Sequence, residues 1–362
     1  AKTLFPYTTL FRSKKWLEPL GVRMALRTGN REENSHADHE GEAQIIIGTH
    51  ALLYQENAFP DLGLVVIDEQ HKFGVAQRTK LISHGVKADV LVMTATPIPR
   101  TLTMTLYGDL DVSVLDERPA NRGKIITALR NQPKVSDITH FIKEHLANGR
   151  QAYLVYPLVE ESENVKAESA TEAFEKWTKR LKPHVTGLLH GKIPAEEKER
   201  IMQQFRAGEI HTLVATSVIE VGVDVPNANI MIIHHAERFG LAQLHQLRGR
   251  IGRGEHKSYC ILLTDSKTPE ALEKLQALVD SNDGFVIAEA DLRLRGPGDV
   301  LGTAQSGVSD IKFVDFLADT VLLREARTLA DQVIAEDPLL ENQHLALRPF
   351  IHIETMALTH RD

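Results

Sequence analysis

The stretch LVVIDEQH, residues 64–71, decides the fold class of this chain. Its four apolar residues predict a buried strand of a parallel sheet. In open α/β sheets, ligands bind just beyond the carboxyl ends of such strands. Asp68 and Glu69 stand at that point, where one carboxylate can orient hydrated Mg²⁺ and the other an attacking water. A strand followed by a solvated acidic turn is the alternative interpretation of the same residues.

Short apolar runs of this kind recur on both sides of the stretch. In chain order they are 45–47, 64–67 and 90–93, followed by 152–156, 185–189, 213–215, 230–233 and 259–263. Helical patterns separate several of them, for example 138–147 and 195–205. Strands that alternate with helices predict parallel sheets joined by right-handed crossovers.

The polar segment 116–124 (DERPANRGK) separates the two groups of strands and is typical of a linker. We therefore expect two α/β domains, 14–117 and 118–268. A third region, 269–362, is predicted to be mostly helical, with a glycine-rich turn at 295–307. Residues 1–13 show no helical apolar period, and we interpret them as a foreign or disordered segment, with an ordinary frayed terminus as the alternative.

The composition restricts the class of protein. The 362 residues are 42% hydrophobic and 25% charged, as in soluble globular proteins, with neither a membrane span nor a signal peptide in the sequence. The single cysteine, Cys260, excludes an internal disulfide framework and favours the cytoplasm. Because the net charge is −7, binding to nucleic acid would depend on local basic patches.

Further motifs follow other predicted strands. Residues 94–100 (TATPIPR) place the hydroxyls of Thr94 and Thr96 where they could contact the acidic strand, although an ordinary turn has the same composition. In the second domain, Gly222 permits close backbone approach to a ligand, and Asp224 can accept a hydrogen bond from a sugar hydroxyl. Residues 243–254 (QLHQLRGRIGRG) interleave arginines with glycines, which fits stabilisation of phosphate charge; a basic solvated turn is the alternative.

Together and in this order, these motifs resemble the superfamily of helicases and translocases with two RecA-like domains. Segments 68–78, 94–102, 216–228, 240–254 and 281–307 resemble the bacterial RecG family of ATP-dependent DNA helicases most closely. Mfd, the transcription-repair coupling translocase, is similar through TATPIPRTL and QLHQLRGR, but Gln70 and the segment RGPGDVLGTAQSG favour RecG. The resemblance implies an α/β fold of two RecA-like domains, the first truncated, and a C-terminal helical hairpin and loop for translocation.

The resemblance also implies roles for individual residues, with ATP and Mg²⁺ as cofactors. Asp68 would hold the magnesium ion and Glu69 the water that attacks the γ-phosphate. The remaining nucleotide and coupling roles fall on His71, Thr94, Thr96, Gly222, Asp224, Gln246, Arg250 and Arg253.

The resemblance further implies contacts to DNA phosphates from Thr49, His50, His190, Thr216 and Ser217. Arg295 and Gln305 would link the C-terminal element to the second domain. Lys274 stands where relatives are expected to carry an arginine, so coupling through that helix is in doubt because lysine lacks the bidentate fork. The expected partners are branched double-stranded DNA and single-stranded DNA-binding protein, and we expect a cytoplasmic, nucleoid-associated monomer.

The sequence contains no G-x-x-x-x-G-K-[ST] loop ahead of the acidic tetrad. We therefore expect a gene fragment that begins inside the first motor domain, lacks the wedge domain and is inactive alone. Segment 14–117 would then be poorly stable, while 119–362 could fold. The alternative functions are a DNA-binding accessory module without ATP hydrolysis and an Mfd-like motor that acts on RNA polymerase.

Overall fold

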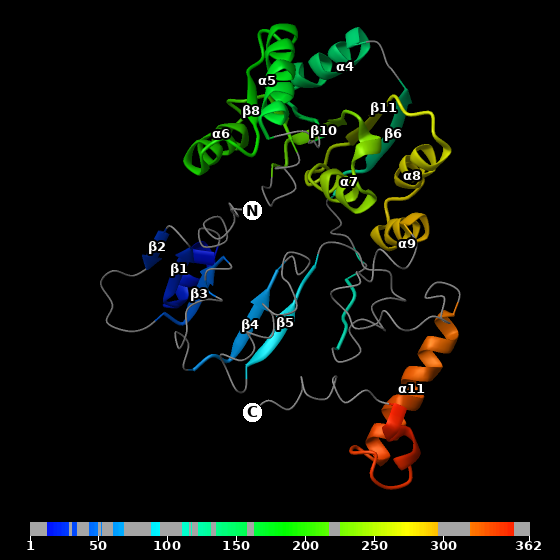
Figure 1. Cartoon of the computed structure of the whole chain (residues 1–362). Coiled ribbons are helices and arrows are strands. Elements are labelled where there is room, and N and C mark those ends of the chain that lie inside the picture. Colours follow the sequence, from blue (N-terminus) through cyan, green and yellow to red (C-terminus); the bar gives the residue numbers. More distant parts are fainter. Residues whose placement is uncertain are drawn as a thin grey trace. The chain divides into compact units, whose positions relative to one another are not determined.

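The computed structural model describes residues 13–28, 31–34, 43–49, 52, 61–68, 88–94, 111–115, 117, 122–131, 135–157, 163–216, 225–295 and 319–350. The chain divides into two compact units, one formed by 1–97 with 117–294 and the other by 98–116 with 295–362. Figure 1 labels their helices and strands. The domain boundaries expected at 117 and 268 stay predictions.

Two small sheets lie ahead of residue 97. The first has the order β2-β1-β3, with β1 at Met24–Thr28, β2 at Arg31–Asn34 and β3 at Ile45–Gly48. The second pairs β4 (Leu64–Ile67) with β5 (Asp89–Val92) in parallel. A short 3₁₀ helix, η1 (Glu18–Leu20), precedes β1. The strands predicted at 45–47, 64–67 and 90–93 are therefore confirmed to within a residue.

Two details of these sheets differ from the sequence-based expectation. β1 pairs antiparallel with β2, because only two residues connect them and a parallel pair needs a crossover of about a dozen residues. The connecting Gly29-Asn30 dipeptide is itself a hairpin signal. In addition, β4 is buried on one face only: Val65 and Ile67 are buried, whereas Leu64 and Val66 are exposed. The prediction of a buried strand from these four apolar residues is therefore correct for one face of β4 only.

The second domain is built on a six-stranded parallel sheet with the order β6-β11-β10-β7-β9-β8. Its strands are β6 (Ile125–Asn131), β7 (Gln151–Val155), β8 (Thr186–Leu189), β9 (Thr212–Ala215), β10 (Ala228–Ile233) and β11 (Ser258–Thr264). Five of the six were predicted. β6 was not, because its start adjoins the polar segment that we interpreted as a linker.

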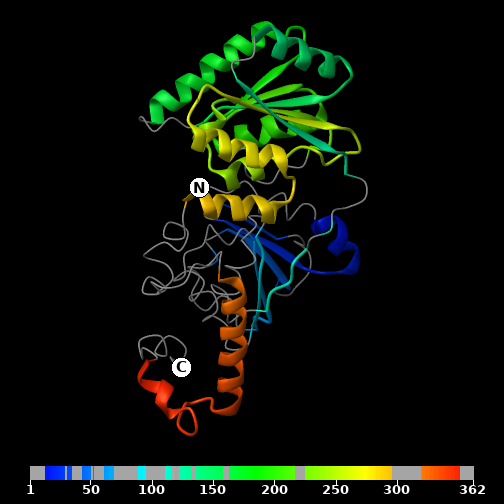
Figure 2. The same cartoon turned by 90° about the vertical axis from the view of Figure 1, so that its right-hand side faces the viewer.

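Helices cover both faces of this sheet (Figure 2). They are α4 (Val135–Ala147), α5 (Glu163–Arg180), α6 (Ala195–Ala207), α7 (Leu241–Arg248), α8 (Pro269–Asp280) and α9 (Gly284–Arg295). One hydrophobic cluster joins α4 and α5 to one face of the sheet, for instance through Ile142 and Trp177. The other cluster joins the four helices α6, α7, α8 and α9 to the opposite face, for instance through Phe205 and Leu278.

Strand residues enter these two clusters alternately. In β7, Tyr153 and Val155 belong to the cluster with α6 to α9, while Ala152 and Leu154 belong to the cluster with α4 and α5. All five residues of β7 are buried, as expected of a central strand covered on both faces. This double cover makes the second domain the best-packed part of the chain that the structure describes.

The other unit contributes helix α11 (Thr320–Glu336) and the 3₁₀ helix η6 (Leu345–Phe350). The carboxylate of Asp337, directly after α11, accepts hydrogen bonds from the backbone amides of Glu341, Asn342 and His344 at 3.0, 2.8 and 3.1 Å. It thereby fixes the turn that leads to η6. The predicted helical character of the C-terminal region is confirmed for α8, α9 and α11. Among the described residues, no helix has the length and apolarity that a membrane crossing requires.

Candidate functional site

Asp68 and Thr94 follow the two strands of the β4–β5 pair. The strands are in register from Leu64 opposite Asp89 to Ile67 opposite Val92, and the amide of Met93 donates to the carbonyl of Ile67 at 2.8 Å. Both side chains are exposed. Because the carboxyl ends of parallel strands meet at one edge, the structure places this carboxylate and this hydroxyl at the same sheet edge.

Several predicted site residues lie outside the described residues, and the structure says nothing of their placement. They are His50, Glu69, His71, Thr96, Ser217, Gly222, Asp224 and Gln305. The nucleotide-binding roles that the resemblance implies for these residues therefore stay predictions.

Thr49 follows β3 and is half-buried, and its amide donates to the carbonyl of Arg27 at 3.3 Å. The preceding Gly48 leaves no room for a larger residue, since a Cβ there would lie 2.6 Å from Cγ of Leu52 and would collide with the carbonyl of Arg27. This close approach fixes the strand end on which Thr49 stands.

The carboxyl ends of four neighbouring strands of the six-stranded sheet form one edge. In three of these strands, the amide of the residue after the strand donates to the last carbonyl of the neighbouring strand in the sheet. The bonds run from Thr216 to Leu189 at 3.2 Å, from Tyr156 to Ala215 at 2.9 Å and from His234 to Val155 at 2.8 Å. His190, after β8, completes the row. The structure thus brings together two predicted DNA contacts, His190 and Thr216. It adds Tyr156 and His234, which the sequence analysis missed; His234 directly follows a predicted strand, whereas Tyr156 was counted as the last residue of the predicted strand 152–156 and lies just after β7.

The turn after β8 concentrates positive charge. Lys198 donates from Nζ to the carbonyl of Gly191 at 2.6 Å, and the amide of Lys192 donates to Nδ1 of His190 at 3.3 Å. Burial lowers the pKa of His190, and the charges of Lys198 and Lys192 lower it further. Lys192 of this turn and Lys198 of α6, on either side of an imidazole, are suited to phosphate oxygens.

The buried Thr216 and the half-buried Tyr156 and His234 form a polar group at the same edge. Thr216 is 1% exposed, and its hydroxyl has no hydrogen-bond partner among the described residues. The ring of His234 stacks on that of Tyr156 with centroids 4.2 Å apart, and Trp177 donates to the hydroxyl of Tyr156 at 2.8 Å.

Burial, and to a smaller extent His235, lowers the pKa of His234 to about 4. Burial raises the pKa of Tyr156 to about 12, against smaller opposing effects of Trp177 and Arg180. Both side chains are therefore neutral at pH 7.

The three arginines of the segment 248–253 have different environments. Arg248, the last residue of α7, is 2% exposed. Its Nη1 donates to the carbonyls of Leu278 and Ser281 at 2.6 and 2.8 Å and to the hydroxyl of Thr127 at 3.3 Å, and its Nη2 lies 3.1 Å from Nδ1 of His245. Arg248 therefore ties α7 to α8 and β6 and is committed to structure.

Arg250 and Arg253 follow in the turn after α7. Arg250 is 9% exposed, while Arg253 is half-buried and donates from Nε to the carbonyl of Gly249 at 3.3 Å. Gln246 is half-buried on α7. These three predicted nucleotide contacts lie on one short segment, the end of α7 and the turn that follows it.

The glycines between these arginines have steric causes. Gly252 has φ of +73°, and a Cβ there would lie 2.6 Å from Cγ1 of Ile125. A Cβ on Gly254 would lie 2.7 Å from the carbonyl oxygen of Pro226. The glycines therefore let the arginine turn pack against β6 and the entry to β10.

Lys274 on α8 donates from Nζ to the carbonyls of Glu237 and Phe239 at 2.6 and 2.9 Å. These carbonyls belong to η5 (Ala236–Arg238) and the residue after it, directly ahead of α7. Lysine thus makes two hydrogen bonds in this position without a guanidinium fork. Arg295 is the last residue of α9, and its side chain lies outside what the structure describes.

Within the described ranges, no group of three or more His, Cys, Asp or Glu side chains is arranged to hold a metal ion. Asp68 supplies an exposed carboxylate directly after β4. Such an oxygen suits Mg²⁺, which commonly takes one or two carboxylates and completes its shell with water and substrate phosphates.

Three family models match consecutive parts of the chain. The DEAD/DEAH box helicase model matches residues 8–105, and the helicase conserved C-terminal domain matches 133–255. The model of ATP-dependent DNA helicase RecG, domain 3, C-terminal, matches 281–348. The last match covers the whole segment 295–307 that had favoured RecG over Mfd.

Curated relatives are similar over most of the chain. The ATP-dependent DNA helicase RecG of Synechocystis sp. is 47% identical over 332 residues, which are 90% of this chain and 40% of the relative. The Bacillus subtilis protein of the same name is 47% identical over 315 residues, 85% of this chain and 45% of the relative. That of Escherichia coli O157:H7 is 46% identical over 333 residues, 88% and 48% of the two chains. The chain spans less than half the length of these relatives.

Among solved structures, a RecG bound to a three-way DNA junction matches with a TM-score of 0.65 and 39% identity, over 88% of this chain and 42% of that one. The Mycobacterium smegmatis helicase Lhr, bound to single-stranded DNA and AMP-PNP, matches with a TM-score of 0.54 and 15% identity, over 77% and 41%. The second likeness concerns the fold alone.

Proposed function

The chain belongs to the RecG family of ATP-dependent DNA helicases, and on that premise we propose that it forms part of an ATP-driven motor that moves along double-stranded DNA and processes branched DNA. The observation that carries the proposal is identity of 44 to 47% to RecG proteins along 85 to 92% of this chain, which includes the acidic strand and the arginine turn. Forks and Holliday junctions in recombination and repair are the proposed substrates.

The acidic strand end would bind the nucleotide through its metal. Asp68 would hold Mg²⁺, which when bound neutralises charge on the β- and γ-phosphates. Glu69 would orient the attacking water, and His71, Thr94 and Thr96 would couple hydrolysis to movement. The placement of Asp68 and Thr94 at one sheet edge supports this assignment.

The arginine turn would stabilise the phosphate charge from the second domain. Arg250 and Arg253 would bind the phosphates, with Gln246, Gly222 and Asp224 completing the pocket. The hydrogen bonds of Arg248 to α8 and β6 support a structural role for Arg248 and a phosphate-binding role for Arg250 and Arg253. Arg248 anchors the start of the turn on which the other two arginines stand.

DNA phosphates would be bound by Thr49, His50, His190, Thr216 and Ser217, and Arg295 and Gln305 would link the C-terminal helices to the motor. The positive turn around His190 supports the DNA assignment. We further propose a monomer in the cytoplasm, associated with the nucleoid, with single-stranded DNA-binding protein as a partner.

The test measures ATP hydrolysis stimulated by a three-way DNA junction. Because the chain spans less than half of its relatives, two proteins are assayed. One is the present chain, and the other joins its residues 16–350 to the preceding part of the Bacillus subtilis relative. The joined protein should hydrolyse ATP, and Arg253→Ala should lower its kcat by about 10³-fold or more with KM little changed.

Lys179→Ala is the matched control, since it removes one cation from an exposed position on α5. Junction-stimulated hydrolysis that is absent from the joined protein, or unaffected by Arg253→Ala, would contradict the proposal. We expect the present chain by itself to show no activity. Activity there would refute that expectation and exclude a non-hydrolysing accessory module.

A further inference from the structure

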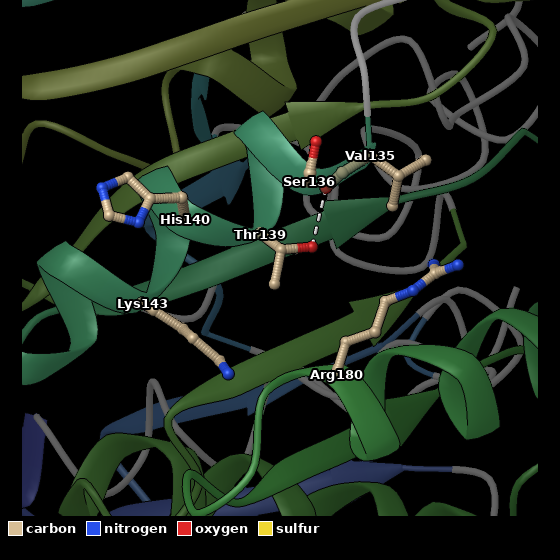
Figure 3. A pocket seen from close by; sticks show the side chains of 6 residues that line it. All are labelled: Val135, Ser136, Thr139, His140, Lys143 and Arg180. Atoms are coloured by element: carbon tan, nitrogen blue, oxygen red, sulfur yellow. Dashed lines mark hydrogen bonds between the residues drawn. The ribbon is translucent and has the colours of Figure 1, made fainter.

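A groove of about 550 Å³ lies between α4 and α5, and its lining includes none of the strand-end residues described above. Figure 3 shows Lys143 extending from α4, and Arg180 from the end of α5, into the space between the two helices. The remaining lining residues, Val135, Ser136, Thr139 and His140, all come from α4. The groove thus has basic side chains on both walls.

The lining contains no carboxylate. Within the part of the chain that the structure describes, Lys143, Arg180 and His140 form no ion pair with an acidic side chain. A local excess of positive charge in a chain of net charge −7 favours an anionic ligand at this place.

The two hydroxyls of the lining already have hydrogen-bond acceptors. Thr139 donates to the carbonyl of Val135 at 2.7 Å, and Ser136 donates to the carboxylate of Asp137 at 3.1 Å. The cations are therefore the groups left to recognise a ligand. Recognition by charge without directional hydroxyl contacts is the pattern of backbone binding, which carries no base sequence information.

Arg180 is held in place by packing. Its guanidinium lies 5.5 Å from the centre of the Trp177 ring, and the indole of Trp177 in turn donates to Tyr156. A guanidinium positioned over an aromatic ring loses less freedom when it binds a phosphate.

A pair of histidines lies near the groove. The rings of His184 and His211 lie 5.3 Å apart, at the start of the loop to β8 and the start of β9. Burial lowers the pKa of His184, and the charges of His211 and Lys143 lower it further. The field of Lys143 therefore extends to the histidine pair.

The groove follows α4 from residue 135 to residue 143, a length of about 12 Å at the helical rise of roughly 1.5 Å per residue. One strand of a nucleic acid carries a phosphate about every 3.4 Å along its axis. A ligand with several regularly spaced negative charges fits this length better than a single anion.

We propose that the groove between α4 and α5 binds the phosphodiester backbone of DNA, at a place separate from the strand-end contacts. The inference rests on the proposed function for the identity of the nucleic acid. Lys143 and Arg180 each bind a phosphate, and His140 borders the path.

The test compares Lys143→Gln/Arg180→Gln with the unaltered full chain, by fluorescence anisotropy on a labelled duplex at several salt concentrations. We expect about 10-fold weaker binding at ~0.1 M salt, and a slope of log K against log salt that is smaller by about 2, because two phosphate contacts are lost. Lys143→Arg/Arg180→Lys should restore the slope.

Lys179→Gln/Lys267→Gln is the control of equal charge change, since both lysines are exposed and neither lines the groove. Thermal melting confirms that each variant is folded. A slope equal to that of the control variant would overturn the inference while leaving the proposed function intact. Absence of duplex binding by the unaltered chain, or poly-glutamate competing as well as unlabelled duplex, would overturn it too; absence of binding would also count against the proposed DNA contacts of the chain.

Discussion

Arg248 and Leu278 are joined by a buried hydrogen bond of 2.6 Å from Nη1 of the arginine to the leucine carbonyl. The bond crosses from the end of α7 to α8 and is accompanied by bonds to Ser281 and Thr127. The first arginine of the motif is thus a structural anchor, and its neighbours are the candidates for chemistry.

Arg248→Met should therefore lower the free energy of unfolding of the second domain by roughly 2–4 kcal/mol, because it leaves buried carbonyls without donors. Arg253→Met should change it by less than about 1 kcal/mol, since Arg253 is half-buried and its Nε donates to the carbonyl of Gly249 in its own turn. Urea denaturation followed by tryptophan fluorescence measures both. Equal stability of the two variants would contradict the distinction between anchor and site.

Gly252→Ala should destabilise the second domain more than Gly149→Ala. Both glycines have positive φ, +73° and +72°, so both substitutions strain the backbone by about 1–2 kcal/mol. Only at Gly252 would the new Cβ also meet Ile125, at 2.6 Å from Cγ1, whereas nothing lies within 4 Å at Gly149.

We expect the difference in free energy of unfolding between these variants to be roughly 1–3 kcal/mol, as in other overpacked sites. Adding Ile125→Ala should reduce the difference, because it removes the atoms that collide. If the two glycine variants unfold at the same denaturant concentration, the packing explanation for the glycine-rich turn is wrong.

The stability of the second domain should fall as the pH is lowered from about 6.5 to about 4. Burial lowers the pKa of His234 to about 4 in the folded chain from the ordinary value of 6.5, so the unfolded chain binds the proton first as the pH falls. The stabilisation is complete above pH 6.5 and is lost progressively below it, by roughly 3 kcal/mol at most. Burial lowers the pKa of His184 and His190 too, which adds to the trend with the same sign.

His234→Phe should flatten this dependence, as measured by melting temperature between pH 7 and pH 4. Phenylalanine keeps the stack on Tyr156 but does not titrate. His140→Asn, at an exposed position on α4, is the matched control. A pH dependence identical in all three proteins would show that His234 does not contribute.

Limited proteolysis of the full chain should leave a resistant fragment within 119–362. Two buried clusters stabilise the six-stranded sheet, whereas the described part of 14–117 has one small cluster around Met24 and Leu26. Trypsin digestion with mass spectrometry identifies the fragment. Recovery of 14–117 as the resistant piece would reverse the expected order of stability.

The sequence by itself determined the strand-and-helix alternation of the second domain and the sheet edge at which the residues after its strands lie. Apolar runs such as 230–233 are long enough to specify a buried parallel strand, and the polar residues that follow them necessarily reach the carboxyl edge. Thr216 and His190, which the family resemblance singled out as DNA contacts, follow two such predicted strands. The same periodicity missed β6, because a strand that begins in a polar segment has no clear start.

Only the tertiary structure decided which of the similar side chains are structural. Arg248, Arg250 and Arg253 are indistinguishable as sequence letters, yet Arg248 has carbonyls from α8 and a hydroxyl from β6 within hydrogen-bonding distance. The depressed pKa of His234 and the basic groove between α4 and α5 likewise depend on residues far apart in the chain. Local patterns cannot specify such contacts, because burial and charge pairing are set by the packing of elements that the sequence separates.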